Sequence, residues 1–183
     1  MPEQPLEIVT PRLLLHGLSL EDTRLVLRGD CDTLGSRIGA RVPASWPGPD
    51  LAESLPGMFA RMEEHPEDAD GWVWVVIDPL AGAVVGDIGF HSPVCEMTSI
   101  EIGYIIFAEA RGKGYATEAA AALIAWAFAQ PGIERVTAQI DPDNDASLRI
   151  AAKLAMRETA REDARYRCFE RLKLADPEKA VTS

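Results

Sequence analysis

Hydrophobic and polar positions along the chain follow two repeating patterns, one typical of strands and one typical of helices. Ile100 to Phe107 is apolar on both faces, which predicts a central strand. From Arg135 to Ile140 apolar and polar residues alternate, which is the period of a strand. Between these runs, Tyr115 to Gln130 places its apolar residues on one helical stripe, and Pro131 and Gly132 end that helix. The three segments predict a strand–helix–strand crossover at the centre of a sheet.

The remaining pattern predicts further elements on both sides of this crossover. Strands are expected at Arg12 to Leu18, Trp72 to Ile77, Ala83 to Phe90 and Tyr166 to Leu174, and helices at Leu20 to Leu27, Leu51 to Glu64 and Asn144 to Ala155. Arg12 to Leu18 is expected at an edge of the sheet, and Asp30 to Asp50, rich in Gly and Pro, is expected to be a loop. This order of elements predicts an α/β fold, of the α+β kind, around one mixed sheet.

Composition indicates one globular domain. The chain has 183 residues, of which 47% are hydrophobic and 26% are charged. We expect a single domain over residues 1–183, with a core at about 10–174 and a frayed tail at 175–183. The sequence has no apolar run of roughly 20 residues, so no association with a membrane is expected. Residues 1–10 lack the basic start and apolar block of a signal peptide, and a cytoplasmic location is expected.

The charge balance and the cysteines exclude several classes of function. A formal net charge of −11 argues against nucleic acid as a partner and is compatible with a cationic substrate such as an amine. Cys31, Cys95 and Cys168 are odd in number and far apart, which fits neither a disulfide framework nor a thiolate metal site. The histidines are equally scattered, and no metal is expected.

The turn between the central strand and the following helix is the best candidate for a ligand site. Residues Arg111 to Ala116 read R-G-K-G-Y-A. Gly112 and Gly114 allow successive backbone N–H groups to point the same way. Arg111 and Lys113 add positive charge, and the start of the helix adds the positive end of its dipole. The pattern favours a phosphate group here, although two glycines in such a turn need no ligand.

Two common nucleotide motifs do not fit this turn. A Walker A loop requires Ser or Thr directly after its Lys, and Gly114 follows Lys113. A dinucleotide fingerprint requires a third Gly where Thr117 stands. A protein that uses the turn to bind ATP or NAD is therefore disfavoured.

A second segment, Asn144 to Met156, reads N-D-A-S-L-R-I-A-A-K-L-A-M. Asn144 is a good helix N-cap, with Ser147 at the third helical position. Capping explains Asn144 fully, but it leaves open why Ser147 stands where Glu or Gln would complete a capping box.

With these segments in place, the chain resembles the GNAT superfamily of acyl-CoA-dependent N-acyltransferases. The turn matches the family pattern Arg-x-x-Gly-x-Ala at Arg111, Gly114 and Ala116. The Asn-x-x-Ser and Lys-Leu-Gly-Phe/Met segments match at Asn144, Ser147, Lys153, Leu154 and Met156, with Ala155 in the place of the Gly. Four further motifs resemble the Rim-type branch, which includes ribosomal-protein N-terminal acetyltransferases: T-P-R-L-L-L at 10–15, G-D-I-G-F at 86–90, E-I-G-Y at 101–104 and G-K-G-Y-A-T-E-A at 112–119. The resemblance covers about residues 10–174.

The resemblance implies a binding mode for acetyl-CoA as co-substrate, without a metal. The two central parallel strands are expected to splay apart, with the pantetheine against the strand edge near Phe107 and the pyrophosphate on the amides of Arg111 to Ala116. The residues implied in cofactor binding are Ile106, Phe107, Arg111, Gly112, Lys113, Gly114, Tyr115, Ala116, Thr117, Asn144 and Ser147. An amine then attacks the thioester directly.

That reaction requires a base, a donor for the oxyanion and help for the departing thiolate. Glu101 is a candidate base, directly or through water, although a paired or solvated strand-end carboxylate is the alternative. Ser147 is the candidate that assists the thiolate, with Asn144 fixing the helix start. Many GNAT enzymes use a Tyr of this helix as the acid, but here Ala151 stands there. Neither Tyr104 nor Tyr115 is carried over to that role.

The expected acceptor is a primary amine, either a protein N-terminus or a small molecule, and the chain is expected to be a monomer or homodimer. The alternative function is a non-catalytic acyl-CoA sensor or partner-binding module on the same fold. Acceptor choice is expected to lie in Asp30 to Asp50, in Leu51 to Glu64 and after Met156. Trp46, in the expected loop, is the tryptophan most suited to a wall of the substrate site, and the other three are expected in the core: Trp72, Trp74 and Trp126.

Overall fold

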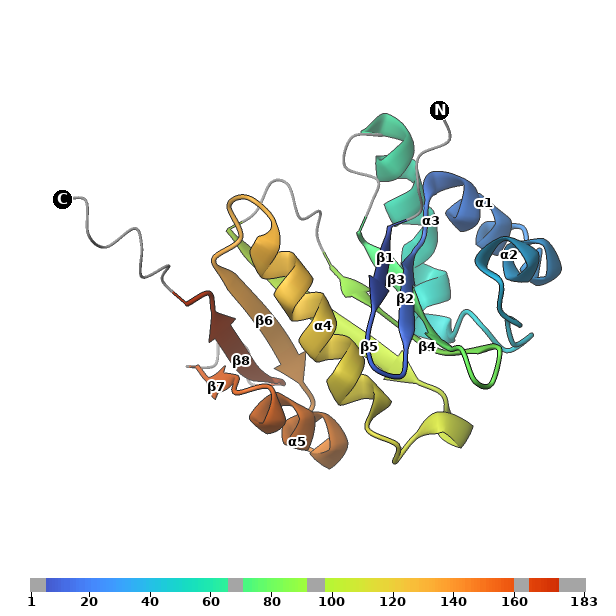
Figure 1. Ribbon diagram of the computed structural model, residues 1–183. Helices are drawn as coiled ribbons and strands as arrows, with labels where there is room; N and C mark the ends of the chain where they lie inside the picture. The colour runs from blue at the N-terminus through green and yellow to red at the C-terminus, as the bar shows by residue number, and fades with distance from the viewer. Residues whose placement is uncertain (1–5, 66–70, 92–97, 160–164, 175–183) are drawn as a thin grey trace.

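The computed structural model describes residues 6–65, 71–91, 98–159 and 165–174, and these form one mixed sheet with helices on both faces (Figure 1). The strands are β1 Glu7–Val9, β2 Leu14–Gly17, β3 Val73–Asp78, β4 Ala83–Phe90, β5 Ser99–Ile106, β6 Arg135–Ile140, β7 Arg157–Glu158 and β8 Arg167–Leu172, in the sheet order β1-β2-β3-β4-β5-β6-β8-β7. The helices are α1 Leu20–Leu27, α2 Cys31–Ile38, α3 Pro49–Glu64, α4 Tyr115–Ala129 and α5 Asp145–Lys153, with a 3₁₀ turn at Ala108–Ala110. Among the described helices, none has the length and apolar character needed to cross a bilayer.

Two hydrophobic clusters lie on opposite faces of the sheet. Helix α4 packs over one of them, which includes Leu123 of α4 and Ile102 of β5. Helices α1, α2 and α3 pack over the other, which includes Leu55 of α3 and Val75 of β3 (Figure 1). Strand β3 is buried along its whole length, because alternate residues enter each cluster.

The predicted crossover and the splay of its strands are confirmed. Strands β5 and β6 are parallel, and α4 connects them. Their pairing comprises Ser99 with Arg135, Ile100 with Val136 and Glu101 with Thr137. Beyond Glu101, β5 continues to Ile106 and β6 to Ile140 outside this ladder. The two strands therefore present unpaired edges to each other over the second half of β5.

Two expectations for the N-terminal half are wrong. The strand expected at the edge over Arg12 to Leu18 is β2, and it lies between β1 and β3 because a preceding three-residue strand, Glu7–Val9, pairs with it. The expected loop at Asp30 to Asp50 contains helix α2. The Asp30 carboxylate caps α2 by accepting from Thr33 N, and Gly39 ends it with a left-handed φ of 67°.

The other boundaries differ by one or two residues. Helix α3 begins at Pro49, two residues before the expected Leu51. The final expected strand is β8, which pairs with the two-residue strand β7 as well as with β6. The tail expected at residues 175–183 lies outside the described residues.

Candidate active site

The junction between β5 and α4 has the backbone that a phosphate site requires. Gly112 and Gly114 have φ angles of 76° and 82°, which favour glycine strongly. Gly114 is the N-cap of α4, and no side chain caps this end of the helix. The first N–H groups of α4 are thus left without a side-chain acceptor at the positive end of the helix dipole. An anionic group can accept from them.

Arg12 holds this junction in place from a distant part of the chain. Its Nη1 donates to the Lys113 carbonyl at 2.9 Å, and its Nε donates to Glu118 Oε2 at 2.7 Å. Glu118 Oε1 in turn accepts from Thr10 Oγ1 at 2.7 Å. The Arg12 guanidinium also lies 5.0 Å from the centre of the Tyr115 ring. The segment between β1 and β2 therefore supports the turn and the first helical turn of α4.

The side chains of this junction point to different partners. The Tyr115 hydroxyl donates to Asp78 Oδ2 at 2.7 Å, and this bond lowers the pKa of Asp78 and raises the pKa of Tyr115. Arg111 Nε donates to the Ile106 carbonyl at 2.8 Å. The Phe107 N–H is bonded to the Val85 carbonyl of β4. Because these side chains and this amide are engaged within the protein, the remaining backbone N–H groups are the feature of the junction most suited to an anion.

Glu101 lies where the β5–β6 pairing ends, at the other end of the unpaired stretch of β5. Its Oε2 accepts from Gln139 Nε2 at 3.1 Å, and its Oε1 lies 3.4 Å from His91 Nδ1. The His91 side chain is 60% exposed and lies against Gly103, where a Cβ would come within 2.9 Å of Nε2. A carboxylate that orients one ring nitrogen of a histidine leaves the other free for proton transfer.

Asn144 and Ser147 lie together at the start of α5. Asn144 Oδ1 accepts from Ser147 N at 3.1 Å, as expected for an N-cap. Ser147 also interacts with Tyr104 of β5. Burial raises the pKa of the Tyr104 phenol, and the Ser147 side chain lowers it. Ala151, which stands in the position of the family's tyrosine, is 2% exposed. Tyr104 therefore brings a phenol to the region where sequence reasoning placed a serine alone.

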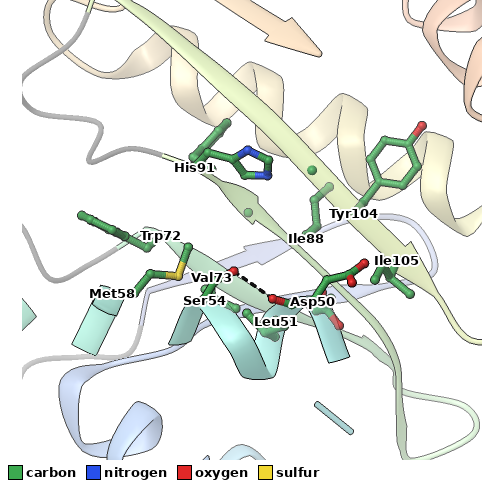
Figure 2. Close-up of a pocket in the computed structure, with 14 residues that line it drawn as sticks. Asp50, Leu51, Ser54, Met58, Trp72, Val73, Ile88, His91, Tyr104 and Ile105 are labelled. Atoms are coloured by element: carbon green, nitrogen blue, oxygen red, sulfur yellow. Dashed lines mark hydrogen bonds between the residues drawn. The ribbon is translucent and has the colours of Figure 1, made fainter. Parts of the chain in front are cut away.

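A cavity of about 340 Å³ opens between α3 and strands β4 and β5 (Figure 2). Asp50, Ser54 and Met58 approach it from α3, and His91 lies across from them, whereas the ring of Tyr104 points away from α3 (Figure 2). Its other lining residues are Leu51, Trp72, Val73, Asp87, Ile88, Gly89, Phe90, Gly103 and Ile105. The cavity thus reaches His91 and the β5 backbone at Tyr104, whose phenol packs on the α4 face of the sheet. The cavity opens onto β5 at Gly103, Tyr104 and Ile105.

The tryptophans are placed differently from the expectation. Trp46 is 2% exposed and does not line the cavity, so its expected place in the substrate wall is wrong. Its Nε1 instead donates to Asp87 Oδ2 at 2.9 Å. Trp72, expected in the core, lines the cavity although it is only 6% exposed. Trp74 and Trp126 are core residues whose rings meet edge to face at 5.2 Å.

Asp87 is a further acidic residue that sequence reasoning did not select. It is 8% exposed, and burial raises its pKa to about 6 against the hydrogen bond from Trp46, with a smaller contribution from Asp50. Neither Asp87 nor His91 belongs to a pattern that the sequence alone identifies as catalytic. The pairing of β4 with β5 places Asp87 opposite Ile105, while the His91 N–H donates to the Glu101 carbonyl at 3.0 Å. In the described residues, no group of three or more His, Cys, Asp or Glu is placed to hold a metal ion.

Comparison with known proteins gives the class to which this fold and site belong. The family described as acetyltransferase (GNAT) domain matches residues 12–157. The chain belongs to this family, and it is a GNAT-type N-acetyltransferase. The uncharacterized N-acetyltransferase YjdG of Bacillus subtilis is 31% identical over 118 residues, which are 64% of this chain and 70% of that protein. Alignments with four other Bacillus relatives span 40 to 49% of their length.

Solved structures share the same architecture. The RimL ribosomal L7/L12 α-N-protein acetyltransferase superposes with a TM-score of 0.63 at 14% identity, over 93% of this chain and 96% of that chain. The ribosomal-protein-S5-alanine acetyltransferase of Vibrio fischeri superposes with a TM-score of 0.61 at 15% identity, over 91% and 96% of the two chains. At these identities the likeness shows the fold. The resemblance to GNAT proteins and to Rim-type structures is confirmed, and with it a fold that binds acetyl-CoA.

Proposed function

We propose that this protein transfers the acetyl group of acetyl-CoA to a primary amine by direct attack of the amine on the thioester. The observation that carries the proposal is the unpaired stretch of β5. This stretch begins at Glu101, where the pairing with β6 ends, and finishes at Ile106. The turn that follows Ile106 leads to the uncapped amides at Gly114. The six residues from Glu101 to Ile106 span about 17 Å in an extended strand, a length suited to pantetheine. The diphosphate then accepts from backbone N–H groups of residues 111–117, and Lys113 and Arg111 add positive charge.

Glu101 acts in this proposal as the base, through His91 or a water molecule. An amine arrives in water as an ammonium ion and must lose a proton before its lone pair can attack. The 3.4 Å separation between Glu101 Oε1 and His91 Nδ1 supports this assignment, since His91 Nε2 is then available to the incoming amine. As the nitrogen–carbon bond forms, the carbonyl π electrons move to oxygen, and the proton passes to the Glu101–His91 pair.

Ser147 and Tyr104 assist the departing thiolate. When the carbon–sulfur bond breaks, the sulfur carries the electron pair and needs a proton. Tyr104 is the phenol that interacts with Ser147, and a serine that donates to a phenol oxygen stabilises the phenolate left after proton transfer. In this arrangement Asn144 contributes by fixing the start of α5, and Ser147 supports the acid. No metal takes part in any of these steps.

The acceptor is proposed only as a primary amine. The two ribosomal-protein acetyltransferases that share the fold keep protein N-termini among the candidates. The cavity of about 340 Å³ beside β5 fits a small molecule or the first residues of a peptide.

The alternative of a non-catalytic sensor rests on Ala151, which occupies the position where many GNAT enzymes have a catalytic tyrosine. Tyr104 beside Ser147 supplies a phenol from β5 instead, and this favours the enzyme. A direct test is to incubate the protein with acetyl-CoA and a panel of primary amines that includes peptide N-termini, and to measure free CoA and the acetylated amine. The proposal expects CoA release that depends on the amine. Binding of acetyl-CoA with no amine-dependent release from any member of the panel would support the sensor.

A further inference from the structure

The acidic residues that line the cavity beside β5 lie at a distance from the candidate base, Glu101. Asp87 of β4 pairs with Ile105, which lies four residues beyond Glu101 on β5, about 13 Å in an extended strand. Asp50, in the first turn of α3, lines the same cavity and raises the pKa of Asp87 through its charge. The cavity therefore presents two carboxylates at a distance from the position where an acceptor amine would react.

Asp87 is buried, and no cationic side chain of the described residues pairs with it. Its side chain lines the cavity, and the residue is 8% exposed. Trp46 Nε1 donates to Oδ2, and among the described residues Oδ1 receives no side-chain or backbone hydrogen bond. None of the described residues that line the cavity is Lys or Arg. A buried carboxylate with one neutral donor and a second carboxylate nearby is costly in free energy, and a cation supplied by a ligand would offset that cost.

The remaining walls suit a short hydrocarbon chain. Leu51 and Met58 of α3 and Trp72 line the cavity with apolar side chains. Gly103 contributes no side chain, so the ring of His91 lies directly over the strand there. A ligand that spans from Asp87 toward His91 therefore needs charge at both ends and methylene groups between them.

From this arrangement we infer that the acceptor is a diamine or longer polyamine, whose second, non-reacting ammonium group binds to Asp87 and Asp50. The inference rests on the proposed function for the reacting amine, which points toward His91 and Glu101. It adds a binding site that selects among amines. The formal net charge of −11 favours the approach of such polycations.

The test compares the binding of two amines of equal length. 1,4-Diaminobutane and n-butylamine differ by one ammonium group, and calorimetric titration of each is made into the full chain saturated with CoA, so that no turnover occurs. The wild type is expected to bind the diamine at least about tenfold more tightly than the monoamine. Asp87→Asn, which keeps an oxygen for Trp46, is expected to remove this preference, and Asp50→Asn to reduce it several-fold.

Controls separate this inference from the proposed function. Glu53→Gln removes a carboxylate from the exposed side of α3, and it is expected to leave the preference unchanged. Because Asp87 is buried, the affinity of the Asp87→Asn variant for CoA is measured to check that the variant folds. Asp50 is exposed, so Asp50→Asn is an independent test that does not disturb the core. Equal affinity of the wild type for both amines, or a preference that survives both substitutions, would overturn the inference. A diamine preference without turnover would support the ammonium-binding site at Asp87 and Asp50 and contradict the proposed acetyl transfer instead.

Discussion

Single side chains decide the proposed chemistry, and Glu101 is the first to test. Glu101→Gln keeps the hydrogen-bonding shape of the side chain but removes its charge and basicity. We expect kcat to fall by about 10² to 10⁴, the usual contribution of a general base, with the affinity for acetyl-CoA unchanged. Steady-state CoA release measures kcat, and Glu53→Gln is the matched control. A variant that retains more than half of the wild-type kcat would exclude Glu101 as the base.

Tyr104 and Ser147 are tested as a pair. Tyr104→Phe removes the phenol, and we expect kcat to fall at least tenfold, whereas Ser147→Ala should cost less because the phenol remains. The double variant should be little worse than Tyr104→Phe alone, since both act on one proton transfer. Tyr166→Phe is the control for loss of a phenol elsewhere. Additive losses in the double variant would show that the two hydroxyl groups act separately.

At the scale of single residues, the sequence predicted the family's motif positions and missed their partners. Glu101, Asn144 and Ser147 could be predicted from the sequence because each belongs to a local motif with fixed spacing. His91 and Asp87 were not, because their relation to β5 depends on the register between β4 and β5. The position of Trp46 was wrong because its indole N–H bonds to the buried Asp87, a contact across 41 residues of sequence.

Contacts between elements position the cofactor site, and Arg12 is the clearest case. Arg12→Ala removes the bonds to the Lys113 carbonyl and to Glu118, so the turn before α4 should lose order. We expect the Kd of acetyl-CoA to rise about tenfold, equivalent to one charge-assisted hydrogen bond. Calorimetric titration measures this Kd. Arg28→Ala, at the exposed end of α1, should leave it unchanged, and an unchanged Kd in Arg12→Ala would show that the turn is rigid without this support.

A buried charge network joins β2, α1 and α2. Asp22, 3% exposed, accepts from Arg37 Nε at 2.7 Å and from Ser19 Oγ at 2.6 Å, and His16 Nε2 lies 3.6 Å away. Burial opposes the ionisation of Asp22, but the nearby His16 ring and the hydrogen bonds from Ser19 and Arg37 outweigh it and hold its pKa well below the usual range. Burial likewise opposes the charged form of His16, yet Asp22 and Glu7 raise its pKa.

This network predicts a pH dependence of stability. Asp22→Asn should lower the free energy of unfolding at pH 7 by about 2 kcal/mol or more, because it leaves Arg37 and His16 without their anion. Since the pKa of Asp22 is lower in the folded state, its contribution is complete above its ordinary value of 3.8 and is lost as pH falls below it. Urea denaturation of the wild type and variant should therefore show a difference that shrinks below pH 4. A difference that grows on acidification would contradict the assignment.

Among the elements, long periodic segments were predictable and short ones were not. β5, α4 and β6 were located from their patterns because each buries a complete face or stripe. β1 has only three residues and an exposed Val9, so no period distinguishes it from a loop. Helix α2 was missed because Gly35 and the flanking glycines suggested a loop, whereas the Asp30 cap and the burial of Leu34 and Ile38 stabilise a helix there.

For the whole molecule, the splay of β5 from β6 is what joins the separate motifs into one site. The amides at Gly114, the start of α5 and the Glu101–His91 pair are far apart in the sequence, and the proposed function places acetyl-CoA along the unpaired stretch of β5 between them. The family's motif order made this arrangement predictable. The cavity and its two carboxylates were not, because they arise where α3 crosses β4 and β5.

A crystal structure of the protein with acetyl-CoA tests the central claim most directly. We expect the diphosphate oxygens to lie within hydrogen-bond distance, about 3 Å, of backbone N–H groups of residues 111–117, with the pantetheine along β5 between Glu101 and Phe107. The thioester carbon should then lie between the side chains of His91 and Tyr104. A diphosphate bound at any other part of the surface, or β5 and β6 paired along their full length around no ligand, would contradict the account.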